Sequence, residues 1–194
     1  MALSDKYNIL FIHIPKNAGT ALIDGLGLSP HGHYSWRNHP RFNYNYYKFA
    51  IVRNPWDRVV SAYEFAKMDK SYWHSKDNQT KHPDYDLCQT LTFKECVELL
   101  LKNPSKLKHQ GWGSQHFYVA KEEKIMVDSI LKMENLDKEL KEMFVKLNIN
   151  KIPYIPKSNT STRTLDYKKY YDEETKQIIA EKYKKDIKLF NYTF

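Results

Sequence analysis

The chain contains two mainly apolar stretches, each followed by a short polar turn. The first stretch runs from Ile9 to Ile14 and the second from Tyr47 to Val52. Runs without alternating polar positions are typical of strands that are buried on both faces, as in a parallel sheet. After each turn, apolar residues recur with the spacing of a helix, over about residues 20–26 and 55–68. The pattern therefore predicts two strand–turn–helix units.

The helix after the second strand has a clear start signal. Asn54 suits the N-cap position and Pro55 suits the first helical position. Further along, Thr92 and Glu95 form a capping-box pattern, which predicts a helix to about Lys102. The other predicted elements are a strand over 127–133 and helices over 137–147 and 172–185. Loops are predicted over 69–89 and 149–164. An aromatic tail, 190–194, is expected to pack back on the domain.

These elements predict an α/β fold: a single domain over residues 1–194, with a central, mostly parallel sheet flanked by helices. With 194 residues and 41% hydrophobic residues, the chain is long enough to bury one core. No segment resembles a transmembrane helix, and the first eight residues lack the apolar part of a signal peptide. The two cysteines, Cys88 and Cys96, favour a reducing compartment, expected to be the cytoplasm, without a disulfide framework or a zinc site.

The charge balance indicates an acidic partner. The formal net charge is +8 and the isoelectric point is about 9.2, which suits nucleic acid, an anionic polysaccharide or a polyanionic nucleotide. The lysines are spread along the chain rather than gathered in one block, which argues against a dedicated nucleic-acid arm.

The turn after the first strand, residues 15–20, combines features that bind phosphate. Lys16 supplies a positive charge, Gly19 lets the backbone approach a bound group, and the N–H groups that begin the next helix favour an anion. The order differs from the Walker pattern, in which the lysine follows the last glycine, and no dinucleotide fingerprint is present. An ordinary strand-to-helix turn with an exposed lysine is the alternative.

Two further groups of residues are candidates for the same site. Arg53 directly follows the second strand, and the turn with Lys16 directly follows the first. Because ligands of open α/β sheets bind beyond the carboxyl ends of the strands, both side chains can face one cleft. His31 and His33, separated by one glycine, point to the same side if their segment is extended. Solvated loop histidines are the alternative.

The order Pro-Lys-x-x-Gly-Thr at residues 15–20 resembles the 5′-phosphosulfate loop of the sulfotransferases that use 3′-phosphoadenosine 5′-phosphosulfate (PAPS). Residues 49–63 resemble the 3′-phosphate motif of that family, in which an arginine at the strand end and a serine eight positions later hold the 3′-phosphate. Arg53 and Ser61 match both. The similarity is greatest to the carbohydrate branch, which includes Golgi-type enzymes. The resemblance implies a P-loop-like architecture, PAPS as the donor and no metal.

Uronyl 2-O-sulfotransferases of this branch carry a His-Gly-His element in which one histidine is the catalytic base. The resemblance therefore implies that His33 takes the proton of the acceptor hydroxyl and that His31 orients the acceptor or shares the role, although the element lies unusually close to the loop. His116, His109 and Glu64 are weaker candidates. The implied catalytic residues are His33, Lys16 and His31, and the implied donor-binding residues are Lys16, Asn17, Ala18, Gly19, Thr20, Ala21, Arg53, Ser61, Lys157 and Arg163.

The sequence thus favours sulfuryl transfer from PAPS to a hydroxyl acceptor, expected to be a sugar or polysaccharide, with no nucleic-acid partner. Two alternatives stay open. A nucleotide-dependent phosphotransferase would require ATP and magnesium. A non-catalytic module that binds polyanions would show strongly salt-dependent binding and no response to PAPS.

Overall fold

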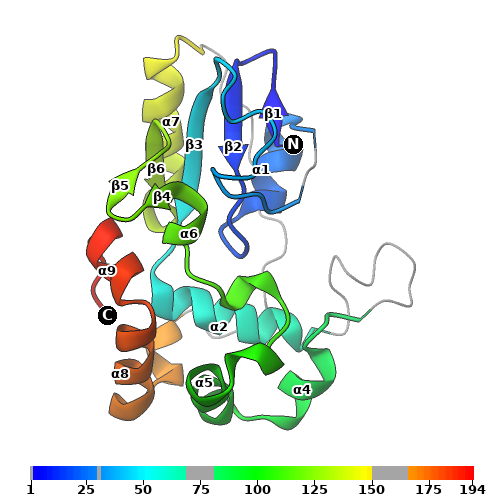
Figure 1. The fold of residues 1–194 in the computed structure, drawn as a ribbon, viewed down its shortest axis with the longest axis vertical. Coiled ribbons are helices and arrows are strands. Elements are labelled where there is room, and N and C mark those ends of the chain that lie inside the picture. Colours follow the sequence, from blue (N-terminus) through cyan, green and yellow to red (C-terminus); the bar gives the residue numbers. More distant parts are fainter. Residues whose placement is uncertain (1, 30–31, 69–80, 150–165) are drawn as a thin grey trace. The chain divides into compact units, whose positions relative to one another are not determined.

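The computed structural model describes residues 2–29, 32–68, 81–149 and 166–194 (Figure 1). Two compact units make up the chain. The α/β unit combines Met1–Arg53 with Ser114–Ser158, and the helical unit combines Asn54–Gly113 with Asn159–Phe194. The chain therefore passes between the units three times, after residues 53, 113 and 158. Because neither unit is one continuous segment, we propose that residues 1–194 form a single domain.

A four-stranded sheet with the order β1-β2-β3-β6 organises the α/β unit. Strand β1 (Leu3–Ser4) is antiparallel to β2 (Ile9–Ile12), whereas β3 (Tyr47–Val52) and β6 (Ser129–Lys132) continue the sheet in parallel. The fold is thus α/β with a mostly parallel sheet, as predicted. The carboxyl ends of β2, β3 and β6 meet at one edge of the sheet, where an open α/β fold places its ligands.

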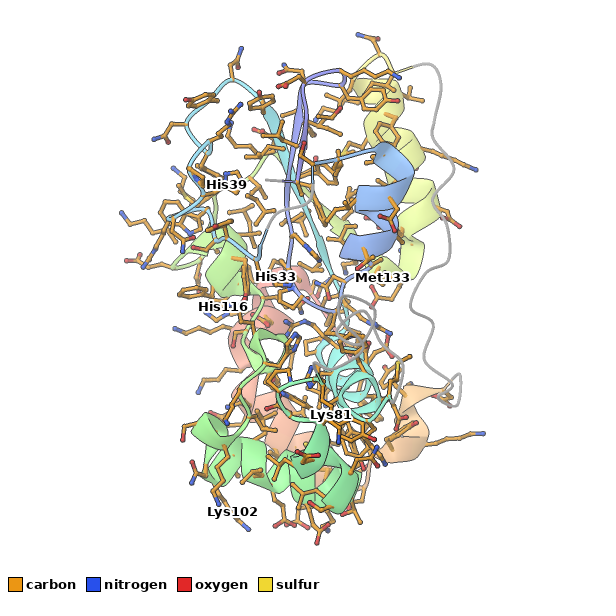
Figure 2. All side chains as sticks on the ribbon, turned by 90° about the vertical axis from the view of Figure 1, so that its right-hand side faces the viewer. His33, His39, Lys81, Lys102, His116 and Met133 are labelled. Carbon is orange, nitrogen blue, oxygen red and sulfur yellow. The ribbon has the colours of Figure 1, made fainter. Side chains whose placement is uncertain are left out.

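Helices α1 (Gly19–Leu26) and α7 (Leu136–Lys146) cover the same face of this sheet, as Figure 2 shows. Alternate side chains of β2 and β3 meet the apolar sides of both helices, because successive residues of a strand point to opposite faces. The shared core consists of Ala2, Ile9, Phe11, Leu22, Leu26, Leu28, Phe49, Ile51, Leu131, Leu140, Met143 and Phe144.

The rest of the α/β unit consists of short elements. Helix α6 (His116–Val119) leads into a hairpin of β4 (Ala120–Lys121) and β5 (Lys124–Ile125), and the 3₁₀ turn η3 (Met133–Asn135) joins β6 to α7. The segment after His33 lies against α6, since the backbone N–H of Trp36 donates to the carbonyl of Tyr118 at 2.8 Å.

The helical unit packs its helices around a separate apolar core. Its elements are α2 (Pro55–Ala66), α4 (Tyr85–Thr90), α5 (Phe93–Lys102), η1 (Pro104–Lys106), η2 (Gln110–Trp112), η4 (Tyr167–Tyr170), α8 (Glu173–Lys182) and α9 (Lys184–Phe190). Helices α2 and α5 supply most of the core side chains, and α8 adds Ile179. Among the described helices of either unit, none combines the length and apolarity needed to cross a membrane.

Most predicted helix starts are confirmed by their hydrogen bonds. The side chain of Asn54 accepts from the N–H of Trp56 at 3.0 Å, with Pro55 in the first helical position. Thr92 and Glu95 form the predicted capping box of α5. The predicted strand and helix over residues 127–147 appear as β6 and α7.

Two predictions about the helical unit are wrong. The loop predicted over residues 69–89 overlaps helix α4, a short helix that buries Cys88; residues 69–80 lie outside the described part. The last helix does not end near Lys185. It is interrupted at Tyr183 and continues as α9. The aromatic tail packs back as expected, with Phe194 against Trp56 at 5.6 Å between ring centroids.

One buried carboxylate holds the segment between η1 and η2. Asp84 is almost fully buried. Its Oδ1 accepts from the N–H of Lys108 at 2.7 Å, and its Oδ2 accepts from the N–H of His109 at 3.0 Å and from Nε1 of Trp112 at 2.8 Å. Removal of the carboxylate would leave these donors without their acceptor in a dry environment.

We expect Asp84→Ala to lower the free energy of unfolding by about 2–4 kcal/mol, measured by urea denaturation. The matched control is Asp86→Ala on the same helix. The Asp86 side chain is 89% exposed and pairs with Lys81 at 3.6 Å, and such exposed pairs contribute only about 0–1 kcal/mol. Equal losses in the two variants would contradict the assigned role of Asp84.

Candidate functional site

The turn between β2 and α1 has an unusual backbone conformation. Lys16 and Ala18 have positive φ angles of 71° and 56°, a left-handed conformation that non-glycine residues rarely adopt and that costs about 1 kcal/mol or more per residue. Strain of this kind is found mainly at binding sites and turns whose surroundings enforce it. Two such residues within three positions make this turn a candidate binding loop.

The start of α1 suits an anion. Its N-cap residue is Ala18, which makes no side-chain capping bond. Alanine has no side-chain acceptor for a first-turn N–H, a capping contact that contributes about 1 kcal/mol in the helices that have it. Without such a cap, the N–H groups of the first turn, which includes Thr20 and Ala21, are directed toward the end of β2 together with the positive end of the helix dipole. Lys16 lies two residues before this N-cap and adds a positive charge to the same turn, so the helix start favours an anion.

Gly19 is required for a packing reason that the sequence did not indicate. A Cβ atom at this position would lie 1.8 Å from Nε2 and 2.0 Å from Cδ2 of His13. Only a residue without a side chain can pass this close to the imidazole ring. The sequence predicts that Gly19 lets the backbone approach a bound group. The structure shows that Gly19 also lets the backbone approach the ring of His13.

Buried amides fix the turn to the end of β3. Asn17 is fully buried, and its Nδ2 donates to the carbonyl of Ile51 at 2.7 Å and to Oε1 of Gln115 at 2.8 Å. Oε1 of Gln115 also accepts from the N–H of Arg53 at 2.9 Å, and Nε2 of Gln115 donates to the Arg53 carbonyl at 2.8 Å. The side chain of Asn17 therefore anchors the loop. Only the backbone of Asn17 is then available to bind a ligand.

The structure places Arg53 beside the turn. Its side chain is largely buried, and Nη1 donates to the carbonyl oxygen of Lys16 at 3.2 Å. A guanidinium group has five N–H donors in a rigid fork, which suits bidentate contact with a phosphate. Lys16 and Arg53 thus occupy neighbouring positions at the carboxyl ends of β2 and β3.

His33 reaches the same region from the segment after α1. Its Nδ1 lies 3.0 Å from the carbonyl oxygen of His13. A carbonyl only accepts hydrogen bonds, so Nδ1 carries the proton and Nε2 is the basic nitrogen of the neutral ring. Figure 2 labels His33 and also His116, which begins the helix packed against this segment.

The other predicted residues are placed differently. Ser61 lies in α2 and, like His109 and Glu64, belongs to the helical unit. Nδ1 of His109 accepts from the N–H of Gly111 at 3.0 Å, a capping contact for η2. His31, Lys157 and Arg163 lie outside the described residues. Within the described ranges, no three His, Cys, Asp or Glu side chains come together as a possible metal site.

Two residues of the site were missed in the sequence. Gln115 acts on Asn17 across 98 positions of the chain, and no local pattern encodes such a contact. His13 had a visible signal, since it is the one polar residue of the first apolar run. Burial and, to a smaller extent, the neighbouring charge of His33 lower the pKa of His13 to about 3, so its ring is neutral at physiological pH.

A family model described as the sulfotransferase family matches residues 28–193. The matched range includes His33, Arg53 and Ser61 and begins beyond the turn that carries Lys16. No curated protein and no solved structure matches the chain.

We expect Gln115→Ala to lower the free energy of unfolding by about 2–4 kcal/mol, because the N–H and carbonyl of Arg53 and the amide of Asn17 lose a buried partner. Gln115→Glu keeps an acceptor but cannot donate to the Arg53 carbonyl, so it should also be destabilising. The control is Gln110→Ala, at an exposed position, which should change stability by less than about 0.5 kcal/mol. A Gln115→Ala loss as small as this would show that the amide network does not hold the site.

Proposed function

Because the chain belongs to the sulfotransferase family, we propose that it transfers a sulfuryl group from PAPS to a hydroxyl group, with a carbohydrate as the acceptor. The observation that carries this proposal is the uncapped start of α1 behind the strained turn at Lys16 and Ala18. This turn resembles the 5′-phosphosulfate loop in residue order, and its conformation suits the binding of an anion at a helix N-terminus.

The described residues fit the donor. Lys16 and the backbone N–H groups of residues 17–21 would hold the 5′-phosphosulfate end. Arg53 would hold the 3′-phosphate through its planar fork, and the resemblance adds Ser61 to this contact and Lys157 and Arg163 to a late basic loop. PAPS supplies an activated sulfuryl group on a phosphate that leaves as an anion.

In the transfer step, His33 acts as the general base. Its Nε2 accepts the proton of the acceptor hydroxyl while the hydroxyl oxygen bonds to sulfur, and the bond between sulfur and the bridging phosphate oxygen breaks. Its Nδ1–H stays on the carbonyl of His13, which keeps the ring oriented. A positioned base contributes about 10²–10⁴ in rate.

Lys16 serves chemistry as well as binding. Negative charge grows on the leaving phosphate oxygen during transfer, and Lys16 with the first-turn N–H groups of α1 stabilises that charge. Preorganised donors of this kind contribute about 10²–10³ in rate each. The strained backbone of the turn holds these groups in place before the donor binds, which reduces the reorganisation needed during the reaction.

Exposed aromatic side chains on the segment of the base and on α6 support a sugar acceptor. Tyr34 follows His33 directly and is 37% exposed, and Phe117 in α6 is 58% exposed. The two segments are in contact, since the backbone N–H of Trp36 donates to the carbonyl of Tyr118. Exposed aromatic faces are suited to stack on the apolar faces of sugar rings.

We also propose that the enzyme acts in the cytoplasm. Cys88 and Cys96 are both free thiols buried in the helical unit, in keeping with a reducing compartment.

We expect 3′-phosphoadenosine 5′-phosphate, without magnesium, to raise the melting temperature by about 5–10 °C at a concentration near one hundred times its Kd. ATP and AMP, which lack the 3′-phosphate, should give much smaller shifts. Arg53→Ala and the more conservative Arg53→Lys should reduce the shift, because neither residue offers a planar fork. Arg37→Ala, at an exposed position, is the control and should keep it.

The alternatives give different results in this experiment. A shift with ATP that requires magnesium would favour a phosphotransferase. No shift with any nucleotide, together with salt-sensitive binding of heparin, would favour a polyanion-binding module and overturn the proposed function.

We expect His33→Ala to lower the turnover of radiolabelled PAPS with a panel of polysaccharide acceptors by about 10²–10⁴-fold, because the general base is lost. The nucleotide-induced thermal shift should remain, since His33 is not assigned to donor binding. The control is His116→Ala in the helix next to it. If this variant lost turnover and His33→Ala did not, His116 would be the base.

A further inference from the structure

We propose that His13 is a positioning residue that connects the base His33 to the donor loop, because its ring orients His33 and lies against the start of α1. The inference rests on the proposed function, because it assigns a role in that reaction. It uses three contacts of His13: through its carbonyl, through its ring face and through its ring edge.

The ring of His13 is anchored from the core side. A column of aromatic rings leads outward from the sheet: Phe49 and Phe11 are stacked with centroids 5.1 Å apart, and Phe11 and His13 are stacked at 5.5 Å. His33 is the last ring of this column. The centroids of the His33 and His13 rings are 4.2 Å apart, and the ring planes are tilted by 59°. The column starts on buried strand residues, so it transmits the rigidity of the sheet to His33.

His13 also fixes which nitrogen of His33 is basic. The His13 carbonyl accepts the proton on Nδ1 of His33, and the ring contact limits rotation of His33 away from this bond. A base that must present Nε2 to a substrate needs both restraints, because rotation or a change of tautomer would present the wrong nitrogen.

The contact with Gly19 connects His13 to the donor loop. Nε2 of His13 lies where a Cβ atom of Gly19 would be, so the ring can keep its position only while the first residue of α1 has no side chain. A side chain at residue 19 would displace the ring, and the displaced ring would disturb His33. The start of α1 and His33 are therefore coupled through the ring of His13.

The buried nitrogen of His13 indicates that this arrangement carries a cost in stability. Nδ1 is inaccessible to solvent and has no hydrogen-bond partner among the described residues, which costs about 1–3 kcal/mol. A residue selected for packing alone would be apolar, as at Ile12 and Ile14 on either side.

The charge state of His13 is consistent with this role. Burial lowers the pKa of His13, and the neighbouring charge of His33 lowers it further. A protonated His13 would add a positive charge directly beside His33 and disfavour its protonation during the reaction. The low pKa of His13 keeps its ring neutral while His33 accepts the proton.

The test combines nuclear magnetic resonance of the His33 ring with steady-state kinetics, in His13→Ala and, because this variant could be too unstable, in Gly19→Ala. The latter keeps His13 but adds the Cβ that displaces it. The control is Gly32→Ala, whose Cβ would meet only Tyr34 at an ordinary 3.7 Å. In the wild type and in Gly32→Ala, ¹⁵N shifts should report a single tautomer with the proton on Nδ1.

Both His13→Ala and Gly19→Ala should show a mixture of His33 tautomers and an altered His33 pKa. Their kcat should fall by about 10–100-fold, since a displacement of about 1 Å can cost 10²-fold. For His13→Ala, the KM for PAPS should stay within about threefold. In a His33→Ala background, Gly19→Ala should cost much less in kcat than in the wild type, because the base it displaces is already absent.

An unchanged tautomer and pKa of His33 in both variants would overturn the inference, as would equal costs of Gly19→Ala in the two backgrounds. The resonance measurement needs neither donor nor acceptor. A wild type that shows the single tautomer but no transfer from PAPS would therefore contradict the proposed function while leaving the contact between His13 and His33 supported.

Discussion

The side-chain amide of Gln115 is the contact on which the rest of the site depends. It joins Asn17 in the turn after β2 to both backbone groups of Arg53 after β3, and these three hydrogen bonds are buried. Two parallel strands fix only the direction in which their following turns begin. The amide bonds fix where those turns lie, and they do so in a dry environment where an unmade hydrogen bond is costly. The positions of Lys16 and Arg53 follow from this constraint.

The helix start and the ring column make different demands on the same short turn. An anion site needs N–H groups without a side-chain cap, so it removes a stabilising contact from α1. The close pass of Gly19 over His13 needs a residue without a side chain. Both are local losses of stability, and the buried sheet and amide network offset them. The stability lost at the site is thus offset by parts of the fold that take no part in the chemistry.

Local patterns in the sequence predicted the elements whose signals are themselves local. The apolar runs predicted β2 and β3, and Asn54, Pro55 and the capping box predicted the starts of α2 and α5. The rule that ligands sit at the carboxyl ends of parallel strands brought Lys16 and Arg53 into one region. Helix α4, the interruption at Tyr183 and the role of Gln115 depend on contacts between distant segments, which periodicity and capping do not encode.

The conformation of the turn has a consequence for protein engineering. A search for stabilising substitutions would select Ala18 for a better helix cap, Lys16 for relief from its left-handed backbone and His13 for an apolar replacement, because each is a local defect by ordinary criteria. Together these changes would give a more stable protein in which a side chain caps the N-terminus of α1. In this chain, the positions that look easiest to improve are those at which selection for thermostability and selection for activity point in opposite directions.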